Sequence, residues 1–322
     1  MQWLISGEGE VIIYGDCREK LKELDSESVQ TCVTSPPYWG LRDYGHDDQL
    51  GLEETPEEFT DNIVGVFRQV KRVLKDDGTL WLNLGDSYYA GPKGNNRGEG
   101  ADGGQGRGKL LGFDNIKTKV PNGLKQKDLV GIPWRVAFAL QADGWYLRQD
   151  IIWHKPNPMP ESVTDRCTKS HEYIFLLSKH QKYYCDMESI REEVKQTTNG
   201  LSSVRESGDS RTRSREHWGI PHEPKNVIRK YDEIKGANKR SVWTVNTKPY
   251  SDAHFAVFPE KLIEPCIQAG SKVGDIVLDP FFGSGTTGEV AERFGRNYIG
   301  IELNEDYKSL QQKRCGQMGL GL

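Results

Sequence analysis

The chain has 322 residues, enough for one large α/β domain that carries insertions and buries a sizeable core. A net charge of -4 and a pI of about 6.0 exclude a uniformly basic nucleic-acid-binding protein, so any contact with a polyanion must come from local clusters of charge. There is no run of about 18 apolar residues and no signal-peptide pattern, so we expect a cytoplasmic protein that makes no contact with a membrane.

The first predicted elements are a strand over Val11 to Tyr14, which ends in Gly15-Asp16, and a helix over Cys17 to Leu24. A second apolar run, Val29 to Thr34, predicts another strand that leads directly into TSPPYWG, residues Thr34 to Gly40. Proline has no N–H and restricts its own φ, so two consecutive prolines cannot continue a helix or an inner strand. We therefore expect a rigid turn at the carboxyl end of this strand.

Strand and helix patterns then alternate along the chain. An amphipathic helix is predicted over Glu57 to Leu74, stopped by Asp77-Gly78, and a strand over Thr79 to Leu84. The later elements are a helix over Ile132 to Ala142, strands over Tyr146 to His154 and Glu172 to Ser178, a strand over Asp275 to Asp279, a helix over Glu289 to Phe294 and a strand over Asn297 to Ile301. This alternation predicts an α/β fold with a mainly parallel twisted sheet covered by helices on both faces.

Two segments interrupt the alternation, and both are basic in an otherwise acidic chain. Residues 91–128 hold eight Lys or Arg against four Asp or Glu, and residues 195–240 hold eleven against six. We interpret them as insertions in a catalytic domain made of residues 1–90, 129–194 and 241–322. The second insertion is the candidate target-recognition region. The insertions are either solvated loops or a basic surface that faces phosphates. The candidate contacts of such a surface are Arg97, Arg107, Arg211, Arg213 and Arg215.

The six cysteines are far apart and form no C-x-x-C pair. Neither a zinc site nor a disulfide framework is therefore expected. We interpret these residues as reduced thiols and expect no bound metal.

A glycine-bearing turn follows the strand that ends at Asp279, and its residues are Pro280, Phe281, Phe282, Gly283, Ser284, Gly285 and Thr286. In Rossmann-like sheets such a turn lets the backbone approach a ligand, and an acid at the end of the next strand accepts hydrogen bonds from ribose hydroxyls. Glu302 occupies that place, 23 residues after Asp279. No Lys follows the glycines, so the pattern favours a nucleoside cofactor over a phosphate site. The alternative is a glycine turn needed only for tight packing.

Together, TSPPYWG, DPFFGSGTT and HFAVFPEKL (His254 to Leu262) resemble the amino-directed DNA methyltransferases that use S-adenosylmethionine. The catalytic motif comes first and the cofactor loop last, as in the circularly permuted beta group, and the F-x-G-x-G loop begins at Phe281 or, in a second alignment, at Phe282. The resemblance implies a Rossmann-like methyltransferase fold. It implies that Asp16 contacts the cofactor adenine, although a helix N-cap is an equal alternative. It further implies that His254, Phe258 and Pro259 close over the methionine end.

In this family the catalytic motif acts on an exocyclic amino group, which is a poor nucleophile because its lone pair is delocalised into the base. The Ser35 oxygen and the Pro36 carbonyl can accept its two hydrogens and direct the lone pair towards the methyl group. Pro37 stiffens the turn, and Tyr38 offers an aromatic face to a base turned out of the duplex. Transfer is then direct and in line, without a covalent enzyme intermediate.

Alternatives remain open at this point. Within the resembling family, Ser at the first motif position usually accompanies cytosine N4 methylation, and Asp usually accompanies adenine N6 methylation. Enzymes that methylate a protein glutamine use a related motif, but in the opposite order along the chain. A DNA-binding module with a decayed cofactor pocket is a third possibility. The expected partners are double-stranded DNA and a restriction endonuclease that cuts the same sequence, whereas the recognition sequence and the oligomeric state are not encoded in any local pattern.

Overall fold

The computed structural model describes residues 10–41, 43–46, 48–89, 123–193, 236–247 and 258–315. Most of both basic insertions lies outside these ranges. Of the candidate site residues, Arg97, Arg107, Arg211, Arg213, Arg215 and His254 lie outside the described residues.

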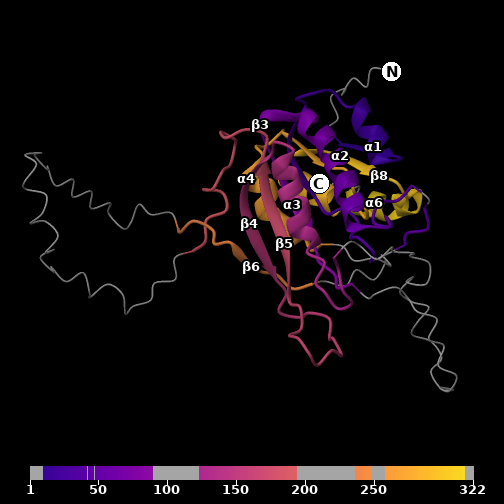
Figure 1. Cartoon of the computed structure of the whole chain (residues 1–322). Coiled ribbons are helices and arrows are strands. Elements are labelled where there is room, and N and C mark those ends of the chain that lie inside the picture. The colour runs from indigo at the N-terminus through magenta and orange to yellow at the C-terminus, as the bar shows by residue number, and fades with distance from the viewer. Residues whose placement is uncertain are drawn as a thin grey trace, which may run out of the picture.

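Within the described residues, the core of the molecule is an eight-stranded sheet (Figure 1). Its strands are β1 (Glu10–Tyr14), β2 (Val29–Thr34), β3 (Leu74–Leu84), β4 (Tyr146–His154), β5 (His171–Ser178), β6 (Val242–Thr244), β7 (Ile276–Asp279) and β8 (Asn297–Glu302). The order across the sheet is β1-β8-β7-β2-β3-β5-β4-β6. Every neighbouring pair is parallel except the two pairs that contain β5. The predicted mainly parallel sheet is therefore confirmed, with one reversed strand.

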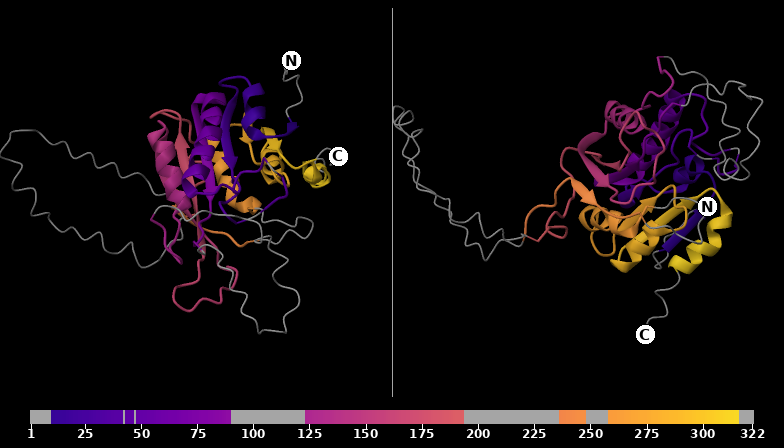
Figure 2. Two further views of the ribbon diagram at one scale, coloured as in Figure 1. Left: turned by 45° about the vertical axis from the view of Figure 1, so that its right-hand side comes forward. Right: turned by 90° about the horizontal axis from the view of Figure 1, so that it is seen from below.

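Helices cover both faces of the sheet, as the alternating pattern predicted. They are α1 (Cys17–Lys20), α2 (Pro56–Val73), α3 (Ile132–Ala142), α4 (Glu260–Gly270), α5 (Thr286–Arg293) and α6 (Lys308–Cys315). One core cluster joins the sheet to α1, α2 and α3, and a second joins it to α4 and α5. The right-hand view of Figure 2 shows the indigo and magenta helices on one side of the sheet and the orange and yellow helices on the other.

The end of α2 differs from the prediction. The helix begins with a capping box between Thr55 and Glu58 and ends at Val73, and β3 begins at once at Leu74. Asp77-Gly78 therefore lies inside a strand and does not stop the helix. The β2–β3 register moves from Val29↔Leu74 to Thr31↔Thr79, so residues 75–78 form an irregularity in β3. The predicted end of the helix at Leu74 is one residue from the observed end, but β3 begins well before the predicted start at Thr79.

Two smaller features also differ from the sequence interpretation. The predicted helix over Cys17 to Leu24 is divided into α1 and a 3₁₀ turn over Leu21–Glu23. The short edge strand β6 was not predicted, because three residues give too little periodicity to be recognised.

Gly300 provides a test of packing between β8 and the glycine-bearing turn. A Cβ atom added at Gly300 would lie 2.4 Å from the ring of Phe282, which is 3% exposed and also packs against Gly288. The ring has no free space into which to move. We expect Gly300→Ala to lower the free energy of unfolding by about 1–3 kcal/mol, measured by urea denaturation.

Gly65→Ala in the middle of α2 is the matched control. Gly65 is exposed, and an added Cβ there meets nothing within 4 Å. The same substitution should therefore stabilise the protein by about 0.5–1 kcal/mol, because alanine has less backbone freedom to lose in a helix. Equal effects of the two substitutions would contradict the packing of Phe282 described above.

Candidate active site

A pocket opens at the carboxyl ends of four neighbouring parallel strands, β1, β8, β7 and β2. In open α/β sheets, ligands bind at this edge. The pocket is lined by Gly15, Asp16, Cys17, Ser35, Pro37, Tyr44, His46, Asp48, Gln49, Leu50, Pro280, Phe281, Gly283, Ser284, Ile301, Glu302, Leu303, Asn304 and Tyr307. The TSPPYWG turn and the glycine-bearing turn therefore meet at one cavity, although they are far apart in the sequence.

Asp279 joins the two turns beneath this pocket. Its carboxylate accepts hydrogen bonds from the Thr34 hydroxyl at 2.6 Å, the Thr287 hydroxyl at 2.6 Å and the Phe281 backbone N–H at 3.0 Å. Asp279 is only 2% exposed and is not among the residues that line the pocket. Burial raises the pKa of Asp279 to about 6, against the hydrogen bonds from Thr287, Thr34 and Phe281 that lower it. Asp279 is thus a structural link between β2 and β7.

The glycine-bearing turn is held from behind by α6. Gly283 and Gly285 have φ values of 52° and 90°, a conformation that side chains strongly disfavour. The Gln311 amide donates to the Gly283 carbonyl at 2.7 Å and accepts from the Tyr14 hydroxyl at 2.6 Å. Gln311 is fully buried, so both ends of its amide are satisfied inside the protein. Strand β1 and helix α6 therefore jointly fix the shape of this turn.

The two phenylalanines of the turn have different surroundings. Phe281 is half-buried and lines the pocket. Phe282 is buried and stacks on Tyr298, with ring centroids 5.5 Å apart and planes 13° apart. Of the two sequence alignments, the one that begins at Phe281 places the aromatic residue in the lining of the pocket. Thr286, the first residue of α5, is buried and does not line the pocket.

Two carboxylates face the pocket from the ends of β8 and β1. Glu302 accepts hydrogen bonds from the backbone N–H groups of Gly283 at 2.6 Å and Asn304 at 2.8 Å, and burial raises its pKa. Asp16 caps α1. Burial opposes its ionisation, but hydrogen bonds and ion pairing with Arg18 hold its pKa below the ordinary value. The helix-cap alternative for Asp16 is thus present in the structure, and the residue also lines the pocket.

The charge of the lining indicates what kind of ligand the pocket fits. Asp16, Asp48 and Glu302 line it, and no Lys or Arg of the described residues does. An acidic lining repels phosphate and favours a ligand with net positive charge, such as a nucleoside that carries a sulfonium and an ammonium group. These residues therefore fit S-adenosylmethionine.

The described part of the HFAVFPEKL segment lies outside this lining. Phe258 packs against the core cluster beneath α4 and α5, and Pro259 is the N-cap residue of α4. Neither is among the pocket residues. Their predicted place at the methionine end of the cofactor stays a prediction.

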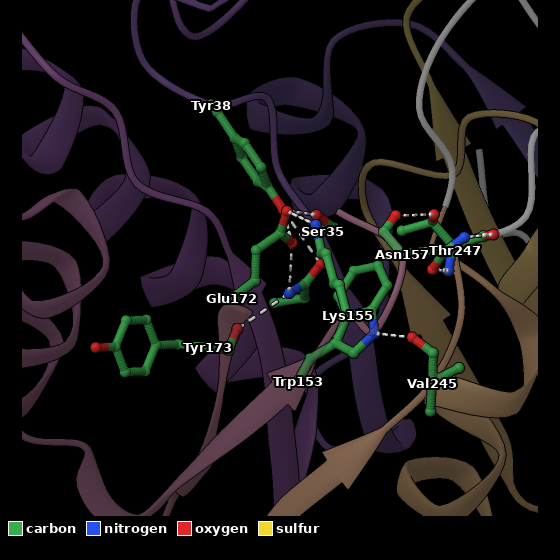
Figure 3. A network of polar contacts seen from close by, with 10 residues as sticks. Ser35, Tyr38, Trp153, Lys155, Asn157, Glu172, Tyr173, Val245 and Thr247 are labelled. Carbon is green, nitrogen blue, oxygen red and sulfur yellow. Dashed lines mark hydrogen bonds and ion pairs between the residues drawn. The ribbon is translucent and has the colours of Figure 1, made fainter. Parts of the chain in front are cut away.

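The TSPPYWG turn is fixed on all sides. Pro36 and Trp39 are buried, and the Trp39 indole donates to the Glu53 carbonyl at 2.9 Å. The Tyr38 ring lies against Gly85, where an added Cβ would be 2.4 Å from Cε2. Tyr38 is half-buried, so its ring is less exposed than the sequence suggested. Its hydroxyl donates to the Glu172 carboxylate at 2.8 Å (Figure 3).

Several residues around the two motifs escaped the sequence interpretation. They are the lining residues Tyr44, His46, Asp48 and Gln49, and the polar group Asn83, Lys155 and Glu172 beside Tyr38. Glu172 was assigned only to a strand. A charged residue in an apolar run, HEYIFLLS, was the one available signal, because side chains of such strands are otherwise buried and apolar.

Comparisons with known proteins agree with this geometry. A family model described as DNA methylase matches residues 29–313. The chain belongs to this DNA methylase family. It is 48% identical over 306 residues to the Type II methyltransferase M.Cfr9I of Citrobacter freundii, covering 95% of this chain and 87% of that protein. It is 49% identical to the Type II methyltransferase M.SmaI of Serratia marcescens, covering 94% and 89%.

Solved structures support the same fold. The PvuII DNA methyltransferase, described as cytosine-N4-specific, matches with a TM-score of 0.61 and 19% identity over 96% of this chain and 89% of its own. A candidate DNA modification methylase of Thermus thermophilus, complexed with S-adenosyl-L-methionine, matches with a TM-score of 0.56 and 25% identity over 97% of both chains. The DNA methylase described here is thus a Rossmann-like methyltransferase that uses S-adenosylmethionine. None of its described helices is long and apolar enough to cross a membrane.

The buried Asp279 predicts a specific pH dependence of stability. Its pKa is about 6 in the folded protein, against 3.8 as the ordinary value, so the folded methylase keeps a proton that the unfolded chain has already released. Ionisation of Asp279 therefore lowers the free energy of unfolding. This loss is absent below about pH 4 and complete above about pH 6, so stability falls as the pH rises through this window.

Asp279→Asn removes the ionisation and keeps an acceptor oxygen. Relative to the wild type, we expect the free energy of unfolding of this variant to rise by about 3 kcal/mol between pH 4 and pH 7. Urea denaturation of both proteins at several pH values measures the difference. Parallel profiles would show that Asp279 is ionised at its ordinary pKa in the folded protein.

Proposed function

We propose that this methylase transfers a methyl group from S-adenosylmethionine to N4 of a cytosine turned out of duplex DNA, by direct in-line transfer. One observation carries the proposal: Ser35, the first candidate acceptor of the catalytic turn, and Gly283, in the glycine-bearing turn, line the same pocket. A base amino group held at Ser35 and a cofactor held at Gly283 can therefore meet.

The cofactor side of the pocket is formed by β1, β7 and β8. Glu302 has spare acceptor capacity beyond its two backbone hydrogen bonds and can bind ribose hydroxyls. Asp16 and Phe281 line the pocket, which supports assigning the carboxylate of Asp16 and the aromatic face of Phe281 to the cofactor adenine. The backbone of Pro280, Gly283 and Ser284 is close enough to the cavity to contact the rest of the cofactor.

The substrate side consists of the turn after β2. When bound beside this turn, S-adenosylmethionine would supply a methyl group on a sulfonium, which an amine nitrogen can accept directly. The Ser35 oxygen and the Pro36 carbonyl accept the two amino hydrogens, which turns the nitrogen lone pair towards the cofactor. Buried Pro36 cannot offer a competing N–H, and the Tyr38 ring positions the base.

The choice of cytosine rests on Ser35. In the family that the motif resembles, serine at this position usually accompanies cytosine N4 methylation, whereas aspartate accompanies adenine N6 methylation. The relatives at 48% and 49% identity are Type II methyltransferases, which favours DNA over a protein glutamine as the substrate. We further propose that a restriction endonuclease acts on the same sequence.

The basic insertions are proposed to contact the DNA backbone. The residues proposed to make these contacts are Arg97, Arg107, Arg211, Arg213 and Arg215. They lie outside the described residues, and their assignment depends on local charge alone. This assignment separates the positive charge that meets phosphate from the acidic lining that meets the cofactor.

Mass analysis of methylated nucleosides identifies the product. The purified enzyme is incubated with S-adenosylmethionine bearing a deuterated methyl group and, in separate reactions, with a bacterial protein extract or with amplified bacterial genomic DNA, which carries no methylated adenine or cytosine. After digestion to nucleosides we expect labelled N4-methyldeoxycytidine. Labelled N6-methyldeoxyadenosine would overturn the choice of cytosine, and label only in a protein extract would overturn DNA as the substrate.

Ser35→Ala tests the role of the catalytic turn. Loss of one acceptor that acts in the transition state should reduce the single-turnover rate by about 10²–10³-fold and leave cofactor affinity within about twofold, as measured by calorimetry. Ser28→Ala, just before the amino end of the same strand, is the matched control and should leave both unchanged. Equal loss of rate and cofactor affinity in Ser35→Ala would contradict the assigned role.

A further inference from the structure

A carboxylate that the family motifs do not include lies behind the catalytic turn. Glu172 is the second residue of β5, which runs antiparallel to its neighbours β3 and β4, so its side chain reaches the same edge of the sheet as the turn after β2. Only 16% of this side chain is exposed. A buried charge needs a partner, and Lys155 forms an ion pair with it.

Within the described residues, the Glu172 carboxylate accepts from three donors. One oxygen pairs with the Lys155 ammonium. The other accepts from the Tyr38 hydroxyl at 2.8 Å and from the Asn83 amide nitrogen at 3.3 Å. Figure 3 shows the Glu172 carboxylate and Ser35 close to the hydroxyl of Tyr38, with Lys155 beside that carboxylate.

Asn83 adds a second acceptor beside the Tyr38 hydroxyl. Its amide nitrogen donates to the Tyr173 carbonyl at 3.0 Å and to Glu172, which fixes the orientation of the amide. The amide oxygen therefore faces Tyr38, at 3.2 Å from its hydroxyl. The single hydroxyl proton of Tyr38 is directed to this pair of acceptors. Burial, and then the charge of Glu172, hold the pKa of Tyr38 well above its ordinary value, so the proton is retained.

The consequence falls on Ser35, whose Oγ lies 3.5 Å from the Tyr38 hydroxyl oxygen. Because the Tyr38 proton points to Glu172 and Asn83, only an oxygen lone pair of Tyr38 faces Ser35, and Ser35 must be the donor in this contact. The distance is long for a hydrogen bond. Such contacts in active sites shorten when the substrate is bound.

A serine hydroxyl can otherwise donate or accept, and only acceptance helps this reaction. A Ser35 proton directed into the pocket would oppose the amino hydrogens of the base. A proton directed at Tyr38 leaves the lone pairs of Ser35 facing the pocket. The direction is thus set by groups that do not touch the substrate.

We propose that Glu172 is a positioning residue: through the Tyr38 hydroxyl it turns the Ser35 proton away from the base and makes Ser35 an acceptor for the target amino group. The three residues Ser35, Tyr38 and Glu172 form a hydroxyl relay. The inference rests on the proposed role of Ser35 as amino acceptor, for either base. It also gives Tyr38 a second task, which needs its hydroxyl and not its ring.

Lys155 keeps the carboxylate of the hydroxyl relay in place. Its ammonium lies 4.2 Å from the centroid of the Trp153 ring, and the Trp153 indole donates to the Val245 carbonyl at 2.8 Å. Asn157 and Thr247 exchange two further hydrogen bonds, of 3.2 and 3.0 Å, between the segments that follow β4 and β6. Strand β4 and the edge strand β6 therefore support a group that acts on the turn after β2.

A double-mutant cycle tests the hydroxyl relay. Single-turnover methylation of amplified genomic DNA is measured at saturating S-adenosylmethionine for the wild type, Tyr38→Phe, Glu172→Gln and the double variant. Each single substitution should slow the rate by about 10–100-fold with cofactor affinity within about twofold. The double variant should be no slower than the slower single variant, because both remove the same effect. The proposal would be overturned if the rate loss of the double variant equalled the product of the two single losses. It would also be overturned if Tyr38→Phe kept the wild-type rate.

The Ser35→Ala background separates this proposal from the proposed function. There, Tyr38→Phe and Glu172→Gln should cause no further loss, since no serine proton remains to be directed. A Ser35→Ala enzyme with normal activity would refute the role of Ser35 itself. A Ser35→Ala enzyme that is slow, and that Tyr38→Phe slows a further 10-fold or more, would refute only the hydroxyl relay.

Matched controls keep the result independent of folding. Tyr146→Phe removes an exposed hydroxyl from β4, and Asp275→Asn removes a carboxylate paired with Lys75 at 3.0 Å near the amino ends of the strands. Both should keep the wild-type rate. Urea denaturation measures the stability of every variant. If Glu172→Gln fails to fold because Lys155 loses its partner, the comparison of Tyr38→Phe in the wild-type and Ser35→Ala backgrounds still tests the hydroxyl relay.

Discussion

One buried carboxylate, that of Asp279, holds the two halves of this active site together. Its hydrogen bonds to Thr34 and Thr287 connect the end of β2 to the start of α5, across a separation of 245 residues between Thr34 and Asp279. Burial makes the charged form costly, and three donors offset part of that cost. The catalytic turn and the glycine-bearing turn are consequently fixed at one edge of the sheet before any ligand binds.

A second polar group lies on the other side of the catalytic turn. Asn83 and Glu172 both accept from the Tyr38 hydroxyl. The Asn83 amide nitrogen in turn donates to Glu172 and to the Tyr173 carbonyl, which fixes the orientation of the amide. Dipoles oriented in advance cost no reorganisation during the reaction, which is the usual source of electrostatic catalysis. The methylase thus combines a stiff backbone turn with fixed hydrogen-bond directions behind it.

Much of the fold and part of the site follow from local sequence patterns. The strand that leads into Ser35, helix α3 over Ile132–Ala142 and the turn around Gly283 were predicted because periodicity and glycine or proline chemistry act over a few residues. The assignment of Asp77-Gly78 as the stop of α2 was wrong, since β3 pairs with β2 from Leu74 onwards and includes these two residues.

By itself, the sequence determined the α/β class, the Ser35 turn and the acidic residue Glu302, because each depends on residue types at short spacing. Only the tertiary structure decided that Asp279 is a buried link, that Gln311 holds Gly283, and that Glu172 faces Tyr38. These contacts join residues 28 to 245 positions apart. Their partners are chosen by the order of the strands and by the reversal of β5, and no local pattern encodes that choice.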